Sequence, residues 1–203
     1  MQSDKYMISK KIITFLLCFC LCIFFFSGCK DNATSKLVNN ADLSSSSYKL
    51  GDYMGNYTVT DINGNTHTFS EILKEKKAIV LNFWFINCGP CQMEFPYLQK
   101  AYDSYSEEIA VIAINPVDNK AEKIEKYAKQ NELTLPLAAG EQAWINAFNL
   151  QGFPTTAVID RYGSVAFMHT GAVVENGVFE KIFEFFTSDS YKQTIINDIT
   201  YIK

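Results

Sequence analysis

The chain has 203 residues, of which 48% are hydrophobic and 20% charged, and its formal net charge is −4. The residues beyond position 50 are numerous enough for one domain with a sizeable core. The net negative charge is the opposite of the basic surface that nucleic-acid binding requires, so nucleic acid is not expected among the partners.

The N-terminal segment has the layout of an export signal. Lys10 and Lys11 precede Ile12–Phe26, a run that carries no charge and is almost wholly apolar. This run falls short of the roughly 20 residues that a membrane-spanning helix needs, and the small residues of a cleavage site follow it. We therefore expect residues 1–28 to be a signal peptide, with an uncleaved signal anchor as the alternative.

The letters FSGC at positions 26–29 resemble the lipobox of bacterial lipoproteins, in which the cysteine is lipidated and becomes the mature N-terminus. Phe26 departs from that family, which usually has an aliphatic residue there. The resemblance implies a lipid on Cys29 and attachment to the extracytoplasmic face of the cell membrane. Residues 29–50 are polar without sustained periodicity, so we expect them to be the lipidated cysteine and a flexible tether.

The cysteine positions indicate which thiols remain in the folded part. Of the six cysteines, three lie in the apolar run and one is Cys29, which leaves Cys88 and Cys91. A secreted domain stabilised by disulfides would contain several more cysteines. This pair is therefore expected to be chemical rather than structural.

The predicted elements begin with a β-hairpin. Tyr57–Asp61 and Thr66–Phe69 alternate in hydrophobicity and flank an Asn-Gly turn, which is a strong hairpin signal. Ser70 is predicted to cap a short helix that ends at Lys74. The branched and aromatic run Ala78–Phe85 then predicts a buried strand.

Helices and strands alternate through the rest of the chain. The apolar spacing predicts a helix from Cys91 through Tyr105 and a central strand at Ile109–Asn115. The next predicted elements are the helix Lys120–Asn131, the strand Leu135–Ala138, the helix Glu141–Asn149, the hairpin Thr155–Asp160 and Val165–Thr170, and the helix Val178–Phe186. This order predicts an α/β domain with a mixed sheet covered on both faces. We expect the domain to span residues 51–187 and residues 188–203 to be a C-terminal extension.

Cys88 and Cys91 flank a Gly-Pro dipeptide at the predicted strand-to-helix turn. A thiol there faces the unpaired N–H groups of the first helical turn and the positive end of the helix dipole, which together lower its pKa. We expect Cys88 to be the exposed nucleophile and Cys91 to be the shielded cysteine that resolves a mixed disulfide. A zinc site is not expected, because His67 and His169 form no ligand pair.

The segments LNFWFINCGPCQMEFPYL and GFPTTAVIDRYGSV resemble the membrane-anchored thioredoxin-like thiol–disulfide oxidoreductases of the TlpA/ResA type. The resemblance covers residues 50–186. It implies a thioredoxin-like fold, in which a central mixed sheet flanked by helices carries an N-terminal β-hairpin and a helical insertion. It also implies that the redox-active disulfide of Cys88 and Cys91 acts without a separate cofactor.

The same resemblance implies further site residues. It implies a cis peptide bond between Phe153 and Pro154, beside which the backbone would pair with an extended substrate. Glu94 matches an acidic residue near the cysteines and is expected to accept a proton from Cys91; the alternative is a solvated surface glutamate. Trp84 is expected in the core or at the rim of the site, where it would add to the substrate-binding surface.

Two positions depart from the common thioredoxin pattern. Asn87 stands where a tryptophan usually precedes the first cysteine, which predicts a smaller and more polar rim around the dithiol. Asn82 stands where thioredoxin has a buried aspartate, and an amide cannot exchange protons at neutral pH. Glu94 is therefore the expected proton acceptor.

These features predict a lipid-anchored, monomeric oxidoreductase that reduces disulfides in exported proteins, such as apocytochromes during cytochrome c maturation or oxidised repair enzymes. Its electrons would come from a membrane thiol carrier. The Gly-Pro dipeptide resembles that of thioredoxin, which implies the reducing direction. The alternatives are a disulfide-forming oxidase on the same scaffold and a lipoprotein binding module that hardly cycles. A thiol peroxidase is disfavoured because its threonine-containing motif is not visible.

Overall fold

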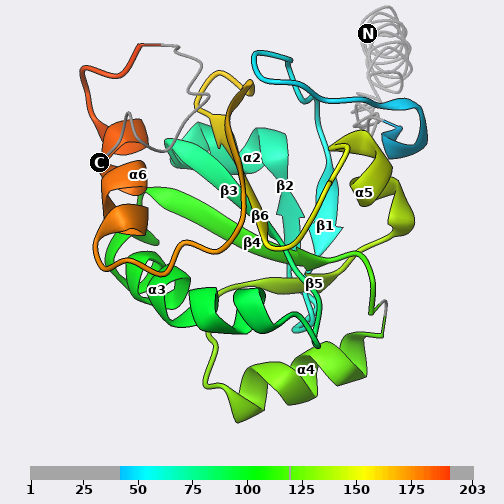
Figure 1. Cartoon of the computed structure of the whole chain (residues 1–203). Coiled ribbons are helices and arrows are strands. Elements are labelled where there is room, and N and C mark those ends of the chain that lie inside the picture. The colour runs from blue at the N-terminus through cyan, green and yellow to red at the C-terminus, as the bar shows by residue number, and fades with distance from the viewer. Residues whose placement is uncertain (1–41, 119, 193–203) are drawn as a thin grey trace, which may run out of the picture. The chain divides into compact units, whose positions relative to one another are not determined.

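The computed structural model describes residues 42–118 and 120–192, and its elements follow the predicted order (Figure 1). The strands are β1 (Thr58–Thr60), β2 (Thr66–Thr68), β3 (Ala78–Phe83), β4 (Ile109–Asn115), β5 (Leu137–Ala139), β6 (Thr155–Asp160) and β7 (Val165–Thr170). The helices are the 3-10 turn η1 (Leu43–Ser45), α2 (Phe69–Glu75), α3 (Gly89–Tyr105), α4 (Ala121–Gln130), α5 (Gln142–Ala147) and α6 (Val178–Thr187).

Five strands form a mixed sheet in the order β5-β4-β3-β6-β7. β3 pairs in parallel with β4, and β4 pairs in parallel with β5. β6 runs antiparallel to β3, and β7 runs antiparallel to β6. Every residue of β3 and β4 is buried, as expected for central strands whose two faces are both covered. β1 and β2 form a separate antiparallel hairpin.

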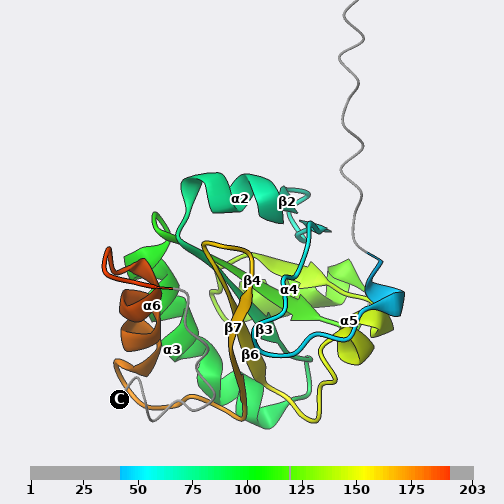
Figure 2. The same ribbon diagram turned by 90° about the horizontal axis from the view of Figure 1, so that it is seen from above.

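The two faces of the sheet are covered by different elements. Ala78 and Val80 of β3 point into a core shared with α3, α4 and α6, whereas Ile79 and Leu81 point into a second core shared with the hairpin, α2 and α5. This alternation follows from the two-residue period of a strand. Figure 2 shows α2 and the hairpin on the side of the sheet away from α3 and α6. The expected mixed sheet covered on both faces is confirmed.

The strand predictions Ile109–Asn115, Thr155–Asp160 and Val165–Thr170 match the structure residue for residue. The predicted cap of α2 is wrong. Thr68 occupies the N-cap position, and Ser70 lies inside the helix, where its backbone N–H donates to Oδ1 of Asn56 at 2.9 Å. A residue outside the helix thus satisfies this N–H group in place of a capping hydroxyl.

The folded domain begins earlier than predicted. Asp42 caps η1 by accepting a hydrogen bond from the backbone of Ser44. The N–H of Tyr48 donates to the carbonyl of Ala147 in α5 at 2.6 Å, and its hydroxyl donates to the carbonyl of Met54 at 2.8 Å. Residues 42–50 are therefore packed on the domain, and the tether predicted for residues 29–50 is wrong over this part.

The folded domain also ends later than predicted. Tyr191 is 7% exposed, and its hydroxyl donates to Oδ2 of the buried Asp160 at 2.9 Å. The guanidinium of Arg161 lies 5.3 Å from the centre of the Tyr191 ring and donates to the carbonyls of Phe186 and Ser188. Ser188 and Tyr191, predicted to lie in an extension, thus contact the folded domain.

The predicted signal peptide, residues 1–28, and the predicted lipid site Cys29 lie outside the described residues. Within the ranges 42–118 and 120–192, no helix is long and apolar enough to cross a membrane.

Candidate active site

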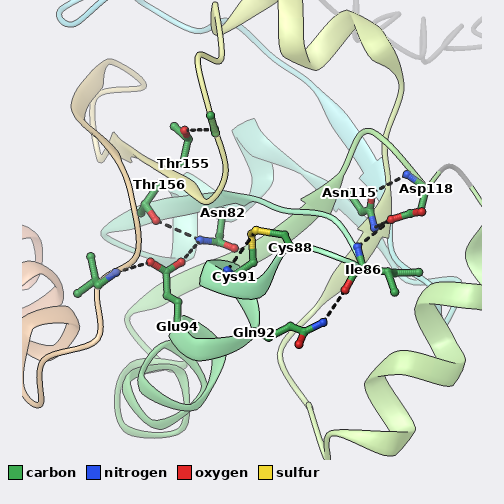
Figure 3. Close-up of a disulfide and its surroundings, with 12 residues drawn as sticks. Asn82, Ile86, Cys88, Cys91, Gln92, Glu94, Asn115, Asp118, Thr155 and Thr156 are labelled. Carbon is green, nitrogen blue, oxygen red and sulfur yellow. Dashed lines mark hydrogen bonds between the residues drawn. A yellow bond between two sulfur atoms is a disulfide. The ribbon is translucent and has the colours of Figure 1, made fainter.

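The predicted cysteine pair lies where the C-terminal end of β3 leads into α3 (Figure 3). Cys88 is the N-cap residue of α3, and it forms a disulfide with Cys91, with a Cα–Cα distance of 5.2 Å. The backbone N–H of Cys91 donates to Sγ of Cys88 at 3.2 Å. The first cysteine therefore receives one of the helix N–H groups that would stabilise its thiolate once the disulfide is reduced.

The expectation that Cys88 is exposed is wrong for this disulfide state. Cys88 is 3% exposed and Cys91 is 2% exposed, because both pack into the core beneath α3. The exposed fractions of the two cysteines are therefore almost equal. Their positions on the helix differ, because Cys88 is the N-cap residue at the positive end of α3 and Cys91 lies within the helix.

Glu94 is buried, as the proton-acceptor hypothesis requires, and the solvated alternative is excluded. The residue is 1% exposed and lies one turn beyond Cys91 on α3. Its Oε1 accepts a hydrogen bond from Nδ2 of Asn82 at 2.7 Å, and its Oε2 accepts one from the backbone N–H of Val173 at 2.7 Å. Burial raises the pKa of Glu94 from 4.5 to about 7, although these two hydrogen bonds oppose the shift.

A carboxyl group with a pKa near the working pH is well placed to accept and release a proton. Asn82 links this carboxyl group to the sheet, because its Nδ2 also donates to Oγ1 of Thr156 on β6 at 3.1 Å. Both N–H bonds of the Asn82 amide are thus used. Figure 3 shows Asn82, Glu94 and Thr156 on one side of the disulfide.

The implied cis peptide bond between Phe153 and Pro154 is confirmed. The ring of Phe153 packs edge-on against Phe85, with 5.4 Å between the ring centres, and both rings are partly exposed. Phe85 lies in the segment between β3 and Cys88. The two aromatic side chains therefore connect the segment before the dithiol with the segment before β6.

The structure does not support Trp84 as a substrate-binding residue. Trp84 is fully buried, with its ring centre 4.9 Å from that of Phe95 and 5.0 Å from that of Tyr127. The Trp84 side chain packs under the site, between α3 and α4, because it lies on the same face of the sheet as Ala78 and Val80 of β3. Its other expected place, in the core, is confirmed.

Metal ligation has no support among residues 42–118 and 120–192, where no group of three or more His, Cys, Asp or Glu side chains could hold an ion. His67 instead contacts the carboxylate of Asp61 at 3.0 Å in the β1–β2 hairpin.

Two contacts at the site were not predicted from the sequence. The N–H of Val173 holds Glu94, and a backbone donor from a loop leaves no residue-type signal. The carboxylate of Asp118, in the loop after β4, accepts a hydrogen bond from the N–H of Ile86. An Asp in a loop with no motif around it could not be assigned to the site before the strands were paired.

The AhpC/TSA family matches residues 50–168 of this chain. The thiol-disulfide oxidoreductase ResA of Geobacillus kaustophilus is 31% identical over 131 residues, which cover 64% of this chain and 74% of that protein. The thioredoxin-like protein YneN of Bacillus subtilis is 33% identical over 111 residues, covering 52% of this chain and 64% of YneN. The crystal structure of StoA from Bacillus subtilis superposes with a TM-score of 0.55 at 22% identity, covering 66% of this chain and 97% of StoA.

Proposed function

Because this chain belongs to the AhpC/TSA family, and within it to the thioredoxin-like thiol–disulfide oxidoreductases of the TlpA/ResA type, we propose that it is a lipid-anchored reductase of disulfides in exported proteins. The observation that carries the proposal is the Cys88–Cys91 disulfide at the N-terminus of α3, with the buried carboxyl group of Glu94 one turn away. The pair needs no further cofactor for this chemistry.

The first step uses the reduced protein. The thiolate of Cys88 attacks one sulfur of the substrate disulfide, so that a bond forms between that sulfur and Cys88 while the substrate S–S bond breaks. The departing substrate sulfur leaves as a thiolate and takes a proton from water. The N–H of Cys91, which donates to Sγ of Cys88 in the disulfide, is in place to stabilise the Cys88 thiolate before the attack.

The second step releases the substrate. Glu94 accepts the proton of the Cys91 thiol, and the resulting thiolate attacks Sγ of Cys88. The mixed disulfide breaks, the Cys88–Cys91 disulfide forms, and the second substrate sulfur leaves as a thiolate. Two electrons have then passed from the dithiol to the substrate. A membrane thiol carrier would then reduce the Cys88–Cys91 disulfide back to the dithiol.

Substrate would bind as an extended polypeptide beside the backbone of Phe153 and Pro154, as the resemblance to thioredoxin-like oxidoreductases implies. The partly exposed rings of Phe85 and Phe153 offer apolar surface next to this segment. Unfolded or partly folded exported proteins, such as apocytochromes during cytochrome c maturation or oxidised repair enzymes, have the exposed chain that such a site requires.

The location rests on the sequence before residue 42. The charged start, the apolar run and the FSGC letters favour cleavage before Cys29, lipidation of Cys29, and attachment to the outer face of the cell membrane. Mass spectrometry of the N-terminus tests this part separately. We expect a lipid-modified Cys29 and no residues 1–28; an unmodified Cys29 or an intact Met1 would contradict anchoring by lipid.

The Cys91→Ala variant tests the reductase function, because a mixed disulfide on Cys88 could no longer be resolved. We expect this variant to accumulate disulfide-linked exported proteins in living cells, and we expect the matched Cys88→Ala, Cys91→Ala double variant to trap none. Equal recovery from the two variants would contradict the function. If the only trapped protein were a membrane protein that oxidises the dithiol, the result would instead favour the disulfide-forming oxidase.

A further inference from the structure

The segment that leads into Cys88 is a tight turn held from two sides. The N–H of Cys88 donates to the carbonyl of Phe85 at 3.1 Å, which closes the turn. Ile86 lies inside it, and both of its peptide groups are bound by other elements. Its N–H donates to Oδ2 of Asp118 at 2.7 Å, and its carbonyl accepts from Nε2 of Gln92 at 2.8 Å (Figure 3).

The Asp118 carboxylate is itself held in place. Asn115, fully buried at the end of β4, donates from Nδ2 to Oδ2 of Asp118 at 3.2 Å. In return, Oδ1 of Asn115 accepts the backbone N–H groups of Val117 at 3.1 Å and of Asp118 at 2.8 Å. The loop after β4 therefore presents a fixed, charged acceptor to the turn before the dithiol.

A hydrogen bond to a charged acceptor is roughly twice as strong as one between neutral groups, and a partly buried one is less weakened by solvent. We propose that Asp118 is a positioning residue for Cys88. The Asp118 carboxylate holds the Phe85–Cys88 turn so that Sγ of Cys88 stays within reach of Cys91. Gln92 supports the same turn from the first part of α3. This inference rests on the thiol–disulfide activity alone and is independent of lipid anchoring and of the direction of electron flow.

The consequence concerns how readily the two sulfurs join. Oxidised glutathione converts the protein dithiol into the Cys88–Cys91 disulfide and is itself reduced to two molecules of glutathione. The equilibrium constant of this reaction reports the effective concentration of one protein thiol at the other. If the turn holds Cys88 beside Cys91, little conformational freedom is lost when the S–S bond forms. Loosening the turn should therefore shift the equilibrium towards the dithiol.

The test compares Asp118→Ala, Asp118→Asn and the unchanged full chain, solubilised in detergent, in glutathione buffers at pH 7. Asn keeps an oxygen that can accept the Ile86 N–H but removes the charge, whereas Ala removes both. We expect Asp118→Ala to lower the equilibrium constant for disulfide formation about tenfold, equivalent to about 30 mV. We expect Asp118→Asn to stay within about threefold of the unchanged chain. Asp103→Ala, which removes a carboxylate that contacts Gln99 on α3, is the control and should not shift the equilibrium.

An equilibrium constant for Asp118→Ala within twofold of the unchanged chain would overturn the proposal. Equal shifts in Asp118→Ala and Asp118→Asn would also overturn it, because the charge beside the thiolate and not the hydrogen bond would then be responsible. Circular dichroism reports whether each variant is folded. If Asp118→Ala does not fold, Gln92→Ala is the test, because the contact between Gln92 and Ile86 is exposed. A shift of the equilibrium constant by about threefold towards the dithiol would support the proposal, and no shift would overturn it.

Discussion

The amide of Asn82 donates a hydrogen bond to the carboxylate of Glu94 at 2.7 Å, in the interior between β3 and α3. This contact places an ionisable group in the interior beside the redox pair and ties it to a residue that cannot titrate. The strand thus supplies a hydrogen-bond donor, and the helix supplies the ionisable carboxyl group.

The first prediction is a pH dependence of folding stability that comes from Glu94. Its pKa is about 7 in the folded chain and about 4.5 when unfolded. Between pH 4.5 and pH 7 the folded state keeps a proton on Glu94 that the unfolded state has lost. The free energy of unfolding therefore decreases as the pH rises from about 4.5 to 7. Linkage gives a total change of about 3 kcal/mol.

Urea unfolding of the disulfide form across pH 4 to 8 measures how the free energy of unfolding changes with pH. Glu94→Gln should lack this decrease, whereas Glu122→Gln, at an exposed position of α4, should keep it. A Glu94→Gln variant with the same slope as the unchanged chain would mean that another group titrates.

The second prediction concerns the rate of exchange. Glu94→Gln removes the proton acceptor for Cys91 and should slow the reduction of insulin disulfides at pH 7 by about 10²–10⁴-fold. The loss should shrink at higher pH, where the Cys91 thiol ionises without help. A rate unchanged at pH 7 would show that water or another group takes the proton.

The third prediction concerns the two thiols of the reduced protein. Because Cys88 caps α3 and Cys91 lies within it, the pKa of Cys88 should fall in the range of roughly 3.5–7.5, and that of Cys91 should not fall below about 8.5. The pH dependence of alkylation in Cys91→Ala and Cys88→Ala measures each thiol in turn. A Cys88 pKa at or above about 8.5 would contradict activation by the helix terminus.

The fourth prediction tests the packing of the C-terminal residues. Tyr191→Phe removes the hydroxyl that donates to buried Asp160, so it should lower the free energy of unfolding by about 1–3 kcal/mol. Tyr53→Phe is the control, because that side chain is 69% exposed and its change should have little effect. Equal midpoints of denaturation for the two variants would mean that the hydrogen bond from Tyr191 to Asp160 does not stabilise the fold.

Most of the sheet could be predicted because its strands carry strong local patterns. The apolar run Ile109–Asn115 and the hairpin of β6 and β7 are encoded by residues adjacent in the chain. The cysteine turn is also local, and so is the one-turn offset between Cys91 and Glu94. The family resemblance added the cis bond before Pro154, which the residues alone left open.

Features that depend on distant contacts could not be predicted. The burial of Cys88 results from packing of α3 on the sheet. The sequence around Tyr191 gives no sign of packing, because its partner Asp160 lies 31 residues earlier. Polar composition around Tyr48 resembled a tether, yet its contact with Ala147 joins segments that only the fold brings together. Likewise, Val173 reaches Glu94 from a loop 79 residues away.

The reduction potential of the Cys88–Cys91 pair tests the proposed reductase function most directly. It can be measured by equilibrating the protein with dithiothreitol or glutathione buffers and counting free thiols by mass spectrometry after alkylation. A reductase should have a potential near that of thioredoxin, about −270 mV. A potential near about −120 mV, at which the protein would donate its disulfide to other proteins, would contradict the proposed direction.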